Sequence, residues 1–221
     1  MKPAYDSFPL GLHLSHVALL RNLDRFIAIA DDEQTAVPHH LVEFVALYVD
    51  FLELHHFGED EFIFPALRRH AAGKSVDVAH LEHWGAEHRE VHASAQSLGR
   101  TATRLGGSAR EGLVELRRIS IDLKELLVPH LASEEEALTS EHLRTMIPEQ
   151  ELENAQRGIG KSTGPRGLAM GAFLAHSLAP REQHALFGEQ PWIVRKLLFG
   201  FVGERRMARF RPFLFEPSLA F

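Results

Sequence analysis

Residues 55–65 read His-His-Phe-Gly-Glu-Asp-Glu-Phe-Ile-Phe-Pro, and this stretch decides how the chain is interpreted. If the stretch is helical, His55 and Glu59 lie one turn apart on the same face. The apolar residues Phe51 and Phe62 continue that face in both directions. An imidazole and a carboxylate among core residues are costly to bury unless something binds both of them. Since this pair suits a metal ion, the stretch predicts part of a metal site.

The composition of the 221-residue chain limits the chemistry of such a site. There is no cysteine, which excludes disulfides, thiolate zinc sites, iron–sulfur clusters and cysteine nucleophiles. There are 15 histidines, and all but His176 and His184 lie before residue 150. Any metal site must therefore use histidine, aspartate, glutamate or tyrosine.

Charge and hydropathy indicate the expected partners and location. Residues 151–221 hold 10 Lys and Arg against 6 Asp and Glu, a net charge of +4. Because the whole chain has a net charge of −6, residues 1–150 have a net charge of −10. An acidic body argues against nucleic-acid binding. The N-terminus lacks the apolar run of a signal peptide, and no apolar stretch reaches the roughly 18 residues of a membrane span. We therefore expect a cytoplasmic protein; the sequence does not indicate its oligomeric state.

Apolar residues recur at helical spacing in four long segments, and no segment shows the alternation of a β-strand. The expected helices run from near Pro9 to Ala30, from near Pro38 to His70, from Ser75 or Asp77 to Leu105 before Gly106-Gly107, and from Ala109 to Leu138. Long amphipathic helices joined by short turns predict an all-α, up-down-up-down four-helix bundle over residues 1–147.

Residues 148–221 are expected to form a helical C-terminal extension. A short helix is predicted from Glu149 to Arg157, followed by a glycine-rich linker over residues 158–167. The remaining tail places aromatic residues such as Trp192 among arginines. We expect this tail to pack on the bundle and cover apolar surface; peripheral contact with a membrane, or with a partner protein, is the alternative.

Each predicted bundle helix carries histidine within its apolar stripe, and two helices add a carboxylate four residues later. The seven donors are His16, His55, Glu59, His88, His92, His130 and Glu134. One histidine on an apolar face is usually a satisfied core residue, but this set would leave many buried polar groups unpaired without a ligand. In an antiparallel bundle all seven fall in one slab, roughly 10–24 Å from the same end. The donors are therefore expected to meet.

The donor types indicate the kind of metal. Imidazole and carboxylate without thiolate suit iron, manganese or zinc, and seven donors exceed the need of one tetrahedral zinc ion. They suit two ions bridged by both carboxylates, with histidines as terminal ligands and one position open for a small ligand. The Glu-x-x-His repeat of ferritin-like sites is present once, from Glu53 to His56, and is rejected for lack of a second copy.

Several assignments stay open at the level of sequence. His13 precedes His16 by three residues, so either could be the ligand from the first helix, although the run from His16 to Arg21 favours His16. Glu135 is the alternative in register to Glu134.

Two residues near His55 also allow different interpretations. Tyr48, seven residues earlier on the same face, is either a core tyrosine or a catalytic residue whose phenol reaches the metal. His56 lies 100° around the helix from His55 and is expected to face outward.

The chain resembles the hemerythrin-like (HHE cation-binding) family. The matching runs are His16-Val-Ala-Leu-Leu-Arg21, His55-His56-Phe-Gly-Glu59 with Ile63-Phe64-Pro65, His88-Arg-Glu-Val-His92, and His130-Leu-Ala-Ser-Glu134. The resemblance covers about residues 8–145. It implies two oxo- or hydroxo-bridged iron ions, with the five histidines as terminal ligands and Glu59 and Glu134 as bridges. Oxygen-carrying members end in His-x-x-x-x-Asp, and the departure here is similar to bacterial relatives linked to oxygen sensing, iron handling and reactions with peroxide or nitric oxide.

We therefore predict a diiron protein that binds or reacts with hydrogen peroxide, dioxygen or nitric oxide, which as an enzyme would be a catalase- or peroxidase-like oxidoreductase. One alternative is a non-enzymatic oxygen or iron sensor or carrier that signals through the C-terminal tail. Another is a bundle with zinc or no metal that acts as an interaction module. The sequence gives no sign of a cleft for a large organic substrate.

Overall fold

The computed structural model describes residues 3–31, 40–70, 78–105, 109–164 and 166–214, which contain helices and no β-strand. This confirms the all-α class. The predicted helix starts at Pro38 and at Ser75 or Asp77, and the stop at Gly106-Gly107, lie outside these ranges.

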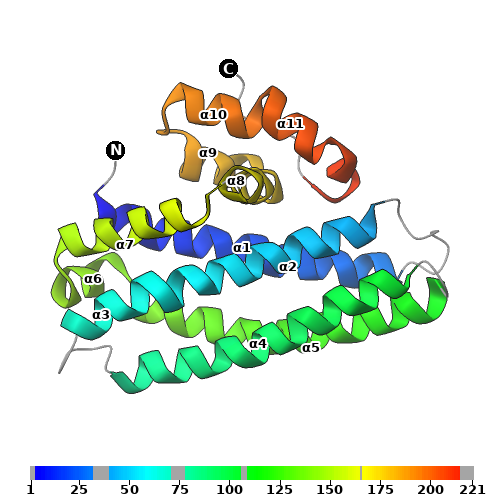
Figure 1. Ribbon diagram of the computed structural model, residues 1–221, viewed down its shortest axis with the longest axis horizontal. Coiled ribbons are helices and arrows are strands. Elements are labelled where there is room, and N and C mark those ends of the chain that lie inside the picture. Colours follow the sequence, from blue (N-terminus) through cyan, green and yellow to red (C-terminus); the bar gives the residue numbers. More distant parts are fainter. Residues whose placement is uncertain (1–2, 32–39, 71–77, 106–108, 165, 215–221) are drawn as a thin grey trace.

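Four long helices lie side by side and form the body of the molecule (Figure 1). They are α1 (Ala4–Asp31), α2 (Leu41–Gly58), α4 (Val78–Arg104) and α5 (Ala109–Ala137). A π-helical stretch, η1 (Glu59–Ile63), continues α2 directly into α3 (Phe64–His70). The quoted stretch 55–65 is therefore helical throughout, as expected.

The first helix starts earlier than its sequence predicts. Pro9 lies inside α1 rather than at its first turn. The extra turns are held by contacts made far away in sequence: the Tyr5 hydroxyl donates to the carbonyl of Ile147 at 2.8 Å, and the Ala4 N–H donates to Glu149 at 2.9 Å. Tertiary packing thus offsets the hydrogen bond that proline removes.

The apolar core is divided along the bundle into two clusters, with polar residues between them. One cluster contains Leu23, Leu52, Leu98 and Leu123, and the other contains Phe64, Trp84 and Leu138. On each long helix, the buried histidines or carboxylates lie between or at the edges of these clusters in sequence. The bundle therefore encloses one polar layer in an otherwise apolar interior.

The remaining helices cover the bundle. They are α6 (Ser140–Met146), α7 (Glu149–Ser162), α8 (Arg166–Ser177), α9 (Pro180–Phe187), α10 (Trp192–Phe199), α11 (Phe201–Met207) and the 3₁₀ helix η2 (Ala208–Phe213). Figure 1 shows α8 to α11 as a second layer beside α1 and α2. Phe173 and Phe213 pack on Phe44 of α2, with the Phe213 and Phe44 rings stacked at 4.7 Å. None of the described helices combines the length and apolar character that a membrane span requires.

The predicted glycine-rich linker is partly wrong, because α7 continues through Gly158 and Gly160 to Ser162. At Gly158 the reason is close packing: a β-carbon there would lie 2.4 Å from the ring of Phe62. Only glycine allows α7 to approach η1 this closely. The glycine that indicated a loop instead serves a helix–helix contact.

Candidate metal centre

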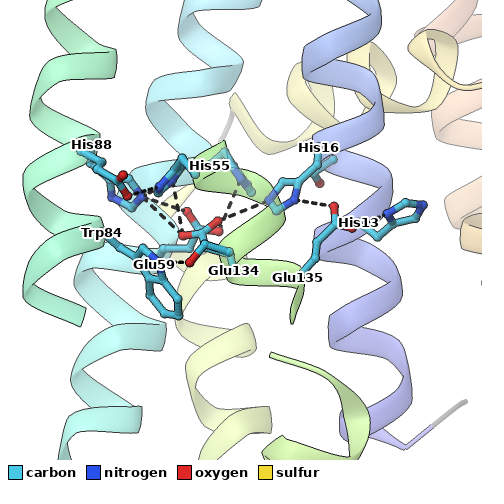
Figure 2. A network of polar contacts seen from close by, with 12 residues as sticks. His13, His16, His55, Glu59, Trp84, His88, Glu134 and Glu135 are labelled. Atoms are coloured by element: carbon cyan, nitrogen blue, oxygen red, sulfur yellow. Dashed lines mark hydrogen bonds and ion pairs between the residues drawn. The ribbon is translucent and has the colours of Figure 1, made fainter. Parts of the chain in front are cut away.

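Six donors from α1, α2, η1, α4 and α5 converge in the polar layer, and all are buried except His55, whose side chain is 9% exposed. They are His16, His55, Glu59, His88, His130 and Glu134. Figure 2 shows the carboxylates of Glu59 and Glu134 in the centre, with His88 on one side and His16 on the other. His16 and Glu134, which are 118 positions apart in sequence, thus share one site.

In each central carboxylate, the two oxygen atoms face the Nε2 atoms of two different histidines. Glu59 places Oε1 3.4 Å from His55 Nε2 and Oε2 3.7 Å from His88 Nε2. Glu134 places Oε2 3.6 Å from His16 Nε2 and Oε1 3.5 Å from His130 Nε2. These distances are long for hydrogen bonds but suit two donors that each lie about 2.0–2.2 Å from a shared cation. Two groups of side chains, His56 with His88 and His130, and His16 with His55, Glu59 and Glu134, each bring their donor atoms close enough to hold a metal ion.

Three of the imidazoles are oriented by outer carboxylates. Nδ1 of His88 bonds Asp60 at 2.9 Å, Nδ1 of His130 bonds Glu87 at 2.9 Å, and Nδ1 of His16 bonds Glu135 at 2.8 Å. An ionised carboxylate only accepts, so each Nδ1 carries the proton and each Nε2 presents a lone pair to the centre. This is the arrangement that fixes the tautomer of metal-binding histidines.

The contact between His88 and His130 favours a positive charge at the centre. Their Nε2 atoms lie 3.1 Å apart, and two lone pairs that face each other repel unless a proton or cation lies between them. Burial lowers the pKa of His88, but hydrogen bonds and charge from Asp60 and Glu134 outweigh it, so the pKa is raised. The site is thus built to stabilise positive charge.

Burial without a ligand is unfavourable for the other donors. Buried nitrogen or oxygen atoms without a hydrogen-bond partner occur on His16, His55, Glu59 and Glu134. Burial, together with the charge of Glu134, raises the pKa of Glu59 well above its usual value. Burial also lowers the pKa of His55, and the neighbouring His16 adds to this shift. Cations would partner all of these atoms, so the residues present fit a metal site.

The π-helical stretch places two consecutive acidic residues in different roles. Glu59 begins η1 with its carboxylate in the centre, while Asp60 bonds the outer nitrogen of His88. A π-helical turn is wider than an α-helical turn and is frequent at functional sites. The stretch 55–65 therefore supplies both an inner donor and the carboxylate that orients a donor on α4.

The structure also places the residues that the sequence left as alternatives. The His16 side chain is 1% exposed and lies in the centre, whereas that of His13 is 51% exposed and bonds Glu135. Glu134 is fully buried among the donors, and Glu135 lies outside them against the two histidines. Partial burial acts to raise the pKa of Glu135, but the hydrogen bonds and charge of His16 and His13 outweigh it, so the pKa is lowered.

The expectation that His56 faces outward is wrong. Its side chain is fully buried, and its ring stacks on His88 at 3.9 Å and 9°. Both ring nitrogens lack a hydrogen-bond partner, and His56, His88 and His130 form a group whose donor atoms lie within 4.8 Å of one another. The buried face of α2 is wide because α4 packs beside it, so a position 100° from His55 remains inside. Periodicity from one stripe could not reveal this.

His92 lies at the edge of the centre. Its ring is 5.3 Å from that of His56, and its buried Nε2 has no hydrogen-bond partner. It also lines a pocket of about 630 Å³ together with Asp50 and Glu53. Burial lowers its pKa, and the charge of Glu53 partly opposes this. Its part as a ligand stays a prediction.

Tyr48 is buried in the core beyond the donors. Its ring makes an edge contact with Phe26 at 5.3 Å, and its hydroxyl has no hydrogen-bond partner. Burial raises the pKa of this phenol well above its usual value. The catalytic part predicted for Tyr48 stays a prediction.

Comparison with known proteins agrees with this centre. The model of the hemerythrin HHE cation-binding domain matches residues 11–153, which contain every donor described above. No curated protein matched the chain, and no solved structure matched it. The matched region spans more than half of the sequence, and the chain therefore belongs to the hemerythrin HHE cation-binding family.

Proposed function

We propose that the chain is a non-haem diiron protein that binds or reacts with a small oxidant: hydrogen peroxide, dioxygen or nitric oxide. The observation that carries this proposal is the division of the Glu59 and Glu134 oxygens between two buried imidazole groups. Such a pair of carboxylates favours two adjacent cations over one. In this proposal the four long helices form an up-down-up-down bundle around the centre.

The proposed ligand set has two halves. His16 and His55 would hold one iron ion, and His88 and His130 would hold the other, with both glutamates shared. A third imidazole could join His88 and His130 at the second iron ion, and either His56 or His92 could supply it. The sequence pattern favours His92, whereas the grouped donor atoms and the two unpartnered ring nitrogens favour His56. We propose that His56 contributes, because it lies nearer to His88 and His130.

Iron bound here would supply redox electrons and open coordination positions for a small ligand. The chain itself supplies the surroundings. The central carboxylates balance positive charge, and Asp60, Glu87 and Glu135 hold the Nδ1 protons of three histidines. The apolar clusters lie on either side of the centre along the bundle. Tyr48 would act from the core of α2, where no other group engages its hydroxyl.

A sensor or carrier without catalysis is the second candidate, and one contact favours it. Arg21 of α1 makes a two-fold hydrogen bond to Glu182 of α9 at 2.7 and 2.8 Å. Arg21 lies five residues after His16 on the same helix, so a change at the centre could reach the C-terminal layer through α1.

Metal counting after anaerobic purification tests the proposal. We expect about two iron ions per chain with charge-transfer absorption, and rapid turnover of peroxide would separate an enzyme from a sensor. His56→Phe should lower iron content more than His92→Phe, since phenylalanine keeps the ring without its donors. Zinc, or no metal, in the purified protein would rule out both candidates. Full iron content in His56→Phe with loss in His92→Phe would return the third imidazole to His92.

A further inference from the structure

A pocket of about 440 Å³ lies between the bundle and the C-terminal helices and is lined by two of the proposed ligands. Its walls come from α1, α2, η1, α7, α8 and α9, and His55 and Glu59 are part of its lining. Figure 1 shows α7 and α8 lying over α1 and α2, the helices that supply most of these walls. The candidate centre therefore borders a space formed jointly by the bundle and its extension.

The pocket is much larger than the proposed oxidants require. Hydrogen peroxide or a diatomic molecule fills about the volume of one or two waters, roughly 30–60 Å³. An apolar cavity of about 150 Å³ already holds a benzene molecule. A space of about 440 Å³ can thus accept an organic molecule of two or three rings, or a chain of similar bulk.

The lining selects against charge. Aliphatic and aromatic side chains such as Phe8, Leu12, Phe51 and Ile159 predominate. Among the described residues of the lining, Glu59 is the one acidic group, and lysine and arginine are absent. An anionic ligand would therefore find no counter-charge in the walls, whereas a neutral apolar molecule would gain from burial.

Helical glycines keep part of this space open. Gly11 of α1, which is half-buried, and Gly160 of α7, which is exposed, both line the pocket, and a β-carbon at either position would meet no other atom within 4 Å. Glycine inside a helix is less stable than alanine by about 0.5–1 kcal/mol, so it is unfavourable where packing does not require it. Close packing explains Gly158, but it does not explain these two.

We propose that this pocket binds a neutral, mainly apolar organic molecule with one end beside His55 and Glu59. The inference rests on the proposed function only in taking these two residues as part of the metal centre. Binding itself follows from the size, lining and position of the pocket, and it does not depend on which metal is present.

Fluorescence titration with 1-aminoanthracene, a neutral molecule of three fused rings, tests the proposal on the purified full chain. We expect one saturable site per chain in the micromolar range. Gly11→Leu and Gly160→Leu fill the pocket and should each weaken binding at least tenfold. Gly99→Leu is the matched control, because it also replaces a helical glycine but lies outside the lining, with Val49 at an ordinary 3.9 Å. Thermal melts would verify that all variants fold.

A second measurement connects the pocket to the centre. In iron-loaded protein, saturation with 1-aminoanthracene should shift the charge-transfer bands, and Gly11→Leu should abolish the shift. The proposal would be overturned if the wild type showed no saturable binding, or if Gly11→Leu and Gly160→Leu both bound 1-aminoanthracene as tightly as the wild type. Charge-transfer bands that did not change at saturation would also overturn it. If the protein holds no iron, the proposed function fails while the titration and its glycine variants still decide whether the pocket binds.

Discussion

At the scale of single residues, the centre depends on carboxylates that do not touch it. Asp60 and Glu87 each bond the outer nitrogen of a histidine whose inner nitrogen faces the donors. They fix both the ring orientation and the tautomer, and they raise the electron density on Nε2. The inner donors were visible in the sequence pattern because they interrupt apolar stripes, but Asp60 and Glu87 look like ordinary helix-surface acids.

Neutralising these outer carboxylates should weaken metal binding. We expect Asp60→Asn and Glu87→Gln each to lower iron affinity about 10–100-fold, because the oriented tautomer is no longer favoured. Competition with a chelator of known affinity would measure the change. Glu61→Gln is the control, since Glu61 lies in the same π-helical stretch but is exposed. Equal affinities in Asp60→Asn and Glu61→Gln would contradict a part for Asp60 in holding His88.

At the scale of elements, the packing contact between α7 and the π-helical stretch η1 determines how the C-terminal helices pack on the bundle. Gly158 lies against Phe62 of η1, while Gly160, half a turn further on, has open space at its β-position. The two glycines look alike in sequence and led to one prediction of a linker. Their surroundings differ because one faces the bundle and the other faces away from dense packing.

Alanine at these two positions should therefore have opposite effects. Gly158→Ala should destabilise the fold by about 1–2 kcal/mol, because the methyl group overlaps the ring of Phe62. Gly160→Ala should stabilise it by about 0.5–1 kcal/mol through helix propensity. Urea unfolding with an unchanged m-value would measure both. A stabilising Gly158→Ala would show that α7 does not pack on η1 as described.

At the scale of the whole molecule, the C-terminal layer is attached to the bundle by both apolar and charged contacts. Phe173 and Phe213 join the core around Phe44. Glu182 accepts from Arg21 of α1 and also from the N–H of Ala179 at 2.7 Å, which caps α9. One carboxylate thus stabilises both a helix start and a contact between layers.

This ion pair makes a pH-dependent contribution to stability. The hydrogen bonds and charge of Arg21 lower the pKa of Glu182. A carboxyl group whose folded-state pKa is lowered adds stability above its unfolded pKa of about 4.3, and this is lost as the pH falls through the folded-state value. We expect Glu182→Gln to cost about 1 kcal/mol near pH 7, since the pair is partly exposed. The cost should shrink below about pH 4.

Chemical denaturation from pH 3 to pH 8 would measure this dependence. Glu136→Gln on α5 removes the same charge from an exposed position and serves as the control. A difference between wild type and Glu182→Gln that stayed constant down to pH 3 would contradict the linkage to Glu182.

The sequence by itself determined the all-α class, the family and the spacing of the inner donors. The reason is that helical periodicity is local: His55 and Glu59 interrupt an apolar stripe one turn apart, and that pattern has the same meaning in any bundle. The sequence also predicted that donors on four helices would meet. Helix length and the expected antiparallel order place the donors at similar distances from one end of the bundle.

Only the tertiary structure decided which groups complete the centre and what lies beside it. His56 is buried because α4 widens the buried face of α2, and Asp60 reaches His88 through a π-helical turn; both depend on neighbours far away in sequence. The pocket beside His55 and Glu59 exists because helices from distant parts of the chain line it together. Such spaces follow from how surfaces fit together, which residue spacing along one helix does not specify.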